Sequence, residues 1–232
     1  MTVPRRRRPR PRTPPLLPRD QRETAFTSIL AALVARVPGA RAAALVDRDG
    51  ETVDYSGEMD SYDVRLAAAH WRLVLDELRR QEALRSVRWV ILRGGRTSYL
   101  VHELPEEYAL VVVLARAAGF FGWRRAVAAC AWALGDEAGW TWAGVRWFPA
   151  QVTADARRRP SLLRIGGHLG PVEILGTMAG GLGRREHGWR VRLHTGVEAT
   201  LVREPGGVWY SDEPLENRHP EAATPRARKK SR

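Results

Sequence analysis

Residues 37–55 read VPGARAAALVDRDGETVDY, and this stretch decides the fold of the first half of the chain. Val37-Pro38-Gly39 ends a preceding helix, because the residue before proline disfavours helix and glycine permits a reversal of the chain. The runs 41–46 and 51–55 flank an Asp-Gly pair, and glycine accepts the positive φ of a hairpin turn. The stretch therefore predicts a helix at about 22–36, followed by two paired strands.

A second helix is predicted from Asp60, which can cap the free backbone N–H groups, to about Arg80. Helical periodicity gives it two apolar faces. The broad face, which suits packing on a sheet, comprises Val64, Ala67, Ala68, Trp71, Val74, Leu75 and Leu78. The narrow face comprises Tyr62, Leu66, Ala69 and Leu73, with His70 beside it. A helix that covers a sheet needs only the broad face, so the narrow face needs another partner.

Two partners suit this narrow face. The same helix from a second copy of the chain would cover it, and Val90 on the next strand is then a further interface residue. Alternatively, a second domain of the same chain covers Leu66 and Leu73. The spacing favours self-association. His70 can titrate at such an interface, although a plain surface histidine is the favoured explanation of its position.

Three strands and a helix complete the first unit. The strands are expected at 87–92, 97–102 and 108–114, with turns at 93–96 and 104–107. The last strand is apolar throughout, which indicates a central strand covered on both faces. The helix is expected from about Phe120 to Leu134, and the single cysteine, Cys130, lies in its apolar stripe as a core residue.

Short strands separated by glycine-containing turns predict a second, β-rich unit at about 145–214, built as a small barrel or rolled sheet. Six strands are expected, the first at 146–152. A unit of about 70 residues buries only a small hydrophobic core, so we expect it to pack against the first unit and to be stabilised by that contact. The predicted organisation is a tail at 1–20, a first domain at 21–136, a linker at 137–144, the β-rich domain at 145–214 and a tail at 215–232.

The formal net charge of +12 lies almost entirely in the two predicted tails. Residues 1–20 carry seven Arg and one Asp, whereas residues 21–216 are close to neutral. The tails read as disordered, and solvated tails explain their charge most simply. As an alternative, basic residues of the tails contact nucleic acid together with the Trp and Arg residues of the β-rich unit. The candidate tail residues are Arg5, Arg6, Arg7, Arg8, Arg228, Lys229 and Lys230.

The sequence contains almost no motif that is typical of a catalytic site. It has no phosphate-binding G-x-x-x-x-G-K-[ST] motif, and its six histidines form no pair at metal-ligand spacing. We therefore predict no catalytic residue, no cofactor and no metal. No signal peptide or apolar run of membrane-spanning length is present, so we expect a cytoplasmic protein without a membrane span.

The order helix, two strands, helix, three strands, helix resembles the roadblock / dynein light chain domain over about residues 22–136. Residues 26–33 resemble its leading helix. Val37-Pro38-Gly39-Ala40 and residues 43–50 resemble its first strand and Asp-x-Asp-Gly turn, and residues 108–114 resemble its last strand. The resemblance covers a little over half of the chain and leaves the β-rich unit without a counterpart.

This resemblance implies a three-layer α/β fold, in which a five-stranded, mostly antiparallel sheet carries one helix on one face and two on the other. It also implies homodimers or heterodimers that join sheets edge to edge and pair the middle helices. Members of the family regulate or scaffold small Ras-like GTPases or act as adaptor light chains, and bacterial members often stimulate such a GTPase. The leading hypothesis is a non-enzymatic dimeric adaptor that binds a small GTPase, and the alternative is a nucleic-acid-binding protein.

Overall fold

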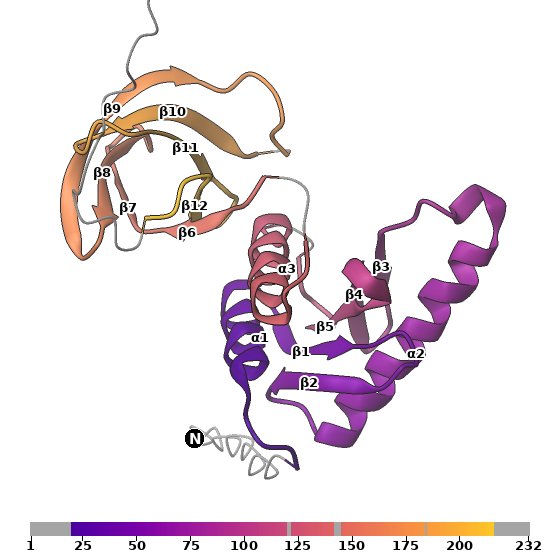
Figure 1. Cartoon of the computed structure of the whole chain (residues 1–232). Coiled ribbons are helices and arrows are strands. Elements are labelled where there is room, and N and C mark those ends of the chain that lie inside the picture. Colours follow the sequence, from indigo (N-terminus) through magenta and orange to yellow (C-terminus); the bar gives the residue numbers. More distant parts are fainter. Residues whose placement is uncertain (1–19, 120–121, 142–144, 184, 216–232) are drawn as a thin grey trace, which may run out of the picture.

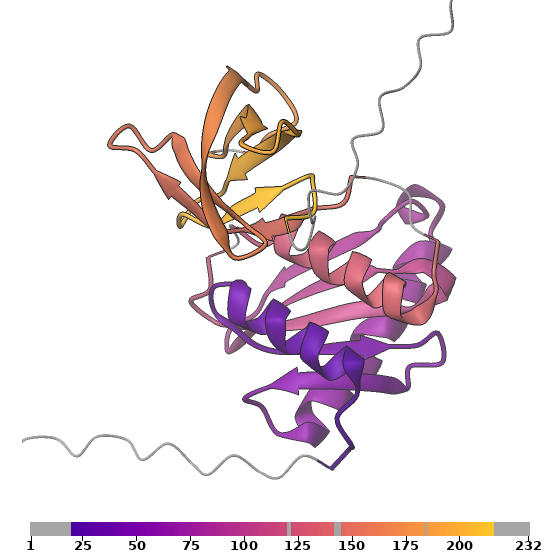
Figure 2. The same ribbon diagram turned by 60° about the vertical axis from the view of Figure 1, so that its left-hand side comes forward.

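The computed structural model describes residues 20–119, 122–141, 145–183 and 185–215. The first domain runs from α1 (Ala25–Arg36) to α3 (Arg124–Ala138), and a β unit follows, from β6 (Phe148–Ala150) to β12 (Trp209–Ser211). Figures 1 and 2 show the two side by side, with the β unit next to α1 and α3 and away from α2. None of the helices in these ranges is long and apolar enough to cross a membrane.

The first domain contains the expected five-stranded sheet. Its strands are β1 (Ala40–Val46), β2 (Thr52–Gly57), β3 (Trp89–Arg93), β4 (Thr97–Glu103) and β5 (Ala109–Ala115). They lie in the order β2-β1-β5-β4-β3, and every neighbouring pair is antiparallel. The continuously apolar β5 is the central strand, as predicted, and its first six residues are buried. The short helices η1 (Glu82–Leu84) and η2 (Pro105–Glu107) connect these elements.

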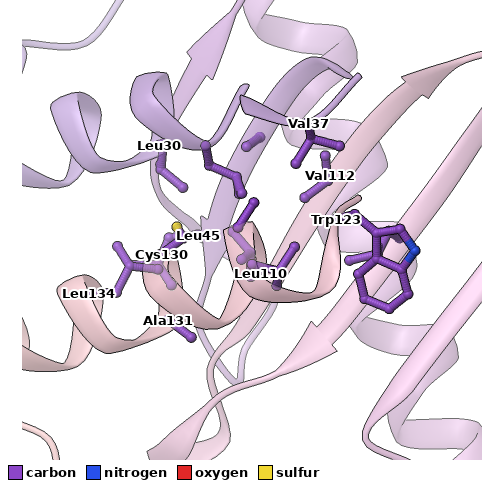
Figure 3. Packing of buried hydrophobic residues seen from close by; sticks show 14 of the residues in the cluster. Leu30, Val37, Leu45, Leu110, Val112, Trp123, Cys130, Ala131 and Leu134 are labelled. Atoms are coloured by element: carbon purple, nitrogen blue, oxygen red, sulfur yellow. The ribbon is translucent and has the colours of Figure 1, made fainter. Parts of the chain in front are cut away.

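Helices cover both faces of this sheet. Buried side chains of α1 and α3 pack on one face around Leu45, Leu110 and Val112, as Figure 3 shows. The inner face of α2 (Ser61–Arg80) packs on the other face, around Ala44, Val111 and Val113. The domain therefore has the predicted three layers, with two helices on one side and one on the other.

Local sequence explains where these elements begin. The Thr24 hydroxyl accepts a hydrogen bond from the backbone of Phe26, while the Thr27 hydroxyl accepts one from the backbone of Thr24, so α1 begins with a capping box. The helix therefore starts at Ala25, three residues later than predicted. At the end of β2, a Cβ on Gly57 would lie 2.3 Å from the Arg41 carbonyl oxygen, so this position requires glycine.

The last helix differs more from the expectation. Helix α3 spans Arg124–Ala138, whereas the apolar stripe predicted about 120–134. Phe120 and Phe121 lie outside the described residues. The helix continues past Gly135, ends at Ala138 and is capped by Gly139, whose φ of 74° lies in the left-handed region. It thus enters what was predicted to be the linker. Periodicity located its buried face correctly but not its ends.

The β unit is a small barrel-like sheet. Its strand order is β6-β12-β11-β10-β9-β8-β7, and the expected first strand is divided at Gln151 into β6 and β7 (Val152–Ala154). Because β6 and β7 are consecutive along the chain, the two ends of the sheet meet, and Figure 1 shows the resulting ring. The other strands are β8 (Pro160–Ile165), β9 (His168–Thr177), β10 (His187–Leu193) and β11 (Glu198–Arg203).

The β unit shares its core with the first domain. Tyr210 of β12 is fully buried and belongs to the cluster that contains Leu30 of α1 and Leu134 of α3, and Trp147 and Val208 pack against the same cluster. A separate cluster around Leu163, Val191 and Leu201 fills the barrel itself. The expectation that this unit packs against the first domain is confirmed.

Candidate functional site

The outward face of α2 carries the candidate interface. Asp60 caps the helix by accepting a hydrogen bond from the backbone N–H of Tyr62 at 2.9 Å, and the helix then extends for 20 residues. Its inner face buries Val64, Ala68, Trp71 and Leu75. On the opposite face, Tyr62, Leu66 and Leu73 are 69%, 56% and 64% exposed. We call Tyr62, Leu66, Ala69 and Leu73 the outer stripe.

The β unit does not cover the outer stripe. Leu66 and Leu73 keep more than half of their surface exposed, and Figures 1 and 2 place the β unit beside α1 and α3. The alternative expectation, that the β-rich domain covers these two leucines, is therefore wrong. The physical reason is that Tyr210 and Trp147 attach the β unit to the core between α1 and α3, on the other side of the sheet.

A shallow groove runs beside the first half of the outer stripe. The turn between β1 and β2 forms one wall, and α2 forms the other. Arg65 on α2 pairs with Asp20 at 3.0 Å, and the Tyr55 hydroxyl donates a hydrogen bond to the same aspartate at 2.6 Å. These contacts fix the start of the described chain beside the groove. The lining residues are Gln21, Gly50, Glu51, Thr52, Tyr62, Arg65, Leu66 and Ala69.

Strand β3 forms a second apolar surface at one edge of the sheet. Among the described strands, it pairs only with β4, so its outer backbone groups face no neighbouring strand. Trp89, Ile91 and Leu92 are 37%, 45% and 42% exposed. An exposed apolar edge strand is a ready template for pairing with another chain. The predicted interface residue Val90 is half-buried and packs instead against the α2 side of the core.

His70 lies beside the outer stripe and is exposed, with its ring 5.7 Å from the ring of Trp71 in an edge-to-face arrangement. Tyr62, Leu66, Ala69, His70 and Leu73 therefore lie together on one accessible helix face. The sequence reasoning missed the exposed residues of β3. Four apolar residues in a row in a five-residue strand were the available signal, since a strand that is apolar on both faces lacks a polar, solvated side.

Burial shifts the pKa of two ionisable groups in the interior of the first domain. Cys130 is buried, and burial raises the pKa of its thiol to about 12, with the charge of Arg36 opposing the shift. Burial lowers the pKa of His102 to about 4, and the positive charge of Arg88 lowers it further. The contact between the His102 ring and the Arg88 carbonyl acts in the opposite direction. The described part of the chain holds no cluster of three or more His, Cys, Asp or Glu side chains that could bind a metal.

The residues considered for nucleic-acid binding fall into two groups. Trp189 and Trp209 are buried in the barrel and offer no exposed ring for base stacking, whereas Trp147 packs against the first domain. Arg190 forms an exposed ion pair of 3.1 Å with Glu198, whereas Arg146 pairs with Asp136 and stacks over the Phe148 ring. The tail residues Arg5, Arg6, Arg7, Arg8, Arg228, Lys229 and Lys230 lie outside the described residues.

No family model matches this chain, and no curated protein matches it. Several solved structures are similar to about half of it. The gliding protein MglB from Thermus thermophilus is 20% identical with a TM-score of 0.43, and the match covers 50% of this chain and 89% of that one. A roadblock/LC7 domain from Streptomyces avermitilis is 23% identical with a TM-score of 0.36, covering 47% and 88%. MglC from Myxococcus xanthus is 22% identical with a TM-score of 0.38, covering 49% and 99%.

The fold assignment follows from the architecture of the first domain itself. Its elements occur in the order α1, β1, β2, α2, β3, β4, β5, α3, and its antiparallel sheet has one helix on one face and two on the other. Residues 25–138 of this chain therefore form a domain with a roadblock-like fold.

Proposed function

We propose that this chain is a non-enzymatic, dimeric adaptor or regulator that binds a small Ras-like GTPase or scaffolds a signalling complex in the cytoplasm. The observation that carries the proposal is the outer stripe of α2. Three large apolar side chains are more than half exposed on a helix whose other face already fills the core. Such a surface gains free energy when another protein covers it.

A second copy of the chain, or a related roadblock-like chain, is the proposed cover. Fully burying one large apolar side chain contributes about 1.5–3 kcal/mol. Tyr62, Leu66 and Leu73 would contribute from both partners of a symmetric pair, because the same patch is used twice. The exposed edge of β3 offers a backbone contact for the same dimer.

The GTPase part of the proposal rests on the family resemblance of residues 22–136. The position of the β unit supports it, because docking beside α1 and α3 leaves α2 accessible. We assign no catalytic residue to the chain. Its contribution would be to bind the GTPase and hold or stimulate it, and the residues that touch the GTPase would lie around the paired α2 helices.

Sedimentation velocity of the full-length chain at micromolar concentration tests the dimer. The wild type should sediment as a dimer, and Leu66→Asp/Leu73→Asp should sediment as a folded monomer, since a charge buried in an apolar contact costs several kcal/mol. Leu169→Asp is the control: it places one such charge on an exposed leucine of the β unit and should leave the dimer intact. A monomeric wild type, or an unchanged double variant, would contradict the proposal.

Binding of a small GTPase is tested in a separate experiment. Immobilised wild type and Leu66→Asp/Leu73→Asp are exposed to extract of the native host containing either GDP or a non-hydrolysable GTP analogue. The wild type should retain a small GTPase in one nucleotide state, and the double variant should retain less of it. If no small GTPase is retained by a wild type that is a dimer, the GTPase part fails and the self-association part stands.

A further inference from the structure

Two carboxylates and one guanidinium meet where the β unit touches the first domain. Arg125 lies in the first turn of α3, Glu204 follows β11, and Glu186 precedes β10. The Arg125 Nη1 atom lies 2.8 Å from Glu186 Oε2 and donates a hydrogen bond to Glu204 Oε1 at 3.1 Å. A single nitrogen of the first domain thus serves two carboxylates of the β unit. We call these three residues the junction cluster.

Water has little access to the junction cluster. The side chain of Glu204 is fully buried, and those of Arg125 and Glu186 are 9% exposed. The Arg125 guanidinium stacks over the Trp147 ring at 4.7 Å from its centroid, and Gly122 lies against Pro205, because a Cβ at Gly122 would be 3.2 Å from the Pro205 carbonyl. The cluster is therefore sealed when the units are docked.

The charges of the junction cluster do not balance. Among the described residues, two ionised carboxylates share one guanidinium, which leaves one negative charge in a buried place, and burying unpaired charge is costly. The neighbouring titratable group is the buried phenol of Tyr210 on β12, which is neutral near pH 7; Arg36 of α1 acts on that phenol as a further cation. Glu204 Oε2 has no hydrogen-bond partner within the described ranges, so a proton on this carboxylate displaces no existing bond.

We propose that the junction cluster takes up a proton when the β unit docks on the first domain, so that docking tightens in acid and loosens as the pH rises. The junction is then a proton-sensitive joint between the two units. A change in docking would move the β unit but would not affect the outer stripe of α2, because the stripe lies on the other side of the sheet.

The direction of the effect follows from Glu204. Burial is the largest cause that raises its pKa above the ordinary 4.5, the charge of Glu186 adds to the rise, and Arg125 opposes it. When the units separate, the carboxyl returns to water and to its ordinary pKa. The docked state therefore holds the proton more tightly. Its extra stability is fully present below pH 4.5 and is lost as the pH rises through the raised pKa.

Hydrogen–deuterium exchange of the full chain tests the joint. Peptides from the first turn of α3 and from β12 report docking, with rates corrected for the intrinsic effect of pH. In the wild type, protection of both peptides should fall as the pH rises, by up to about tenfold per pH unit in the range where Glu204 titrates. Glu204→Gln should remove this pH dependence, since the amide has no charge to lose.

Two further variants make the result decisive. Glu173→Gln removes an exposed, ion-paired carboxylate from β9 and should keep the wild-type pH dependence. Glu186→Gln removes one negative charge from the cluster and leaves Glu204 in place, so it should reduce the pH dependence even if Glu204→Gln does not fold. A wild type whose protection is independent of pH would overturn the proposal, as would equal pH dependence in the wild type and Glu186→Gln.

Discussion

The buried carboxylate of Asp54 accepts a hydrogen bond from the Thr27 hydroxyl at 2.7 Å, and this contact ties the first turn of α1 to strand β2. The Thr24 hydroxyl, which caps α1, donates to the same carboxylate oxygen at 2.6 Å. One side chain thus fixes both the start of the helix and its position on the sheet edge. Burial of a carboxylate is tolerable here because hydroxyl and backbone donors surround it.

Removing this carboxylate should weaken the first domain. Asp54→Ala removes a carboxylate that accepts hydrogen bonds from both hydroxyls, and the loss of this bond at the buried Thr27 should cost about 1–3 kcal/mol. Urea unfolding should show a lower midpoint with an unchanged slope. Asp49→Ala, at an exposed position in the turn between β1 and β2, is the control and should change the midpoint little. Equal midpoints for Asp54→Ala and the wild type would show that the contact does not contribute.

The burial of His102 predicts a loss of stability in acid. Its ring stacks on Trp89 with centroids 3.4 Å apart, and its pKa falls from 6.5 to about 4. Between pH 4 and pH 6.5, His102 is protonated in the unfolded chain and neutral in the folded chain. The neutral histidine therefore favours folding above pH 6.5, and this contribution, of about 3 kcal/mol at most, is lost as the pH falls through about 4.

His102→Gln tests this expectation, because glutamine keeps a polar side chain that does not titrate. The free energy of unfolding, measured between pH 4 and pH 7, should decline more steeply in the wild type than in the variant. Parallel curves would mean that His102 titrates similarly in both states.

Cys130 should be unreactive in the native protein. Burial raises the pKa of its thiol to about 12, so the thiolate that attacks alkylating reagents is nearly absent at pH 8. Because this is the single cysteine of the chain, mass spectrometry after treatment with iodoacetamide should show no adduct on folded protein and one adduct in denaturant. Rapid labelling of the folded protein would indicate that α3 opens locally.

Local periodicity made much of the first domain predictable. The two faces of α2 follow from its own sequence, and the central position of β5 follows from an apolar run that needs cover on both sides. The ends of α3 were less predictable, because Trp123 at its N-cap supplies no side-chain hydrogen bond that would mark a start. The division of the first barrel strand at Gln151 depends on pairing with two different strands, β12 and β8, and no local pattern encodes that.

The junction between the two units could not be predicted from the sequence. Arg125 and Glu204 are 79 positions apart, and each reads in isolation as an ordinary surface charge. Only the folded arrangement of α3 against the β unit buries them together. Tyr210 is similar: its strand suggests a barrel residue, yet its side chain completes the core of the first domain.

The exposed edge of β3 predicts that the dimer uses the sheet as well as the outer stripe. Ile91 is 45% exposed in the middle of this strand, and a lysine there should oppose edge-to-edge pairing, as lysines do at natural sheet edges. Ile91→Lys should weaken self-association at least about tenfold, which corresponds to about 1.4 kcal/mol. Its thermal unfolding should change little, because the replaced side chain is already half exposed.

The opposite edge of the same sheet supplies the control for this prediction. Val53 on β2 is 38% exposed, so Val53→Lys introduces the same charge at a comparable depth on the other edge strand. Sedimentation equilibrium of the two variants should show which edge strand takes part in the dimer. The dimer should weaken in Ile91→Lys and persist in Val53→Lys. If both variants remain dimers while Leu66→Asp/Leu73→Asp is a monomer, the α2 helices alone form the interface. If Val53→Lys alone dissociates, the sheets join through β2 instead.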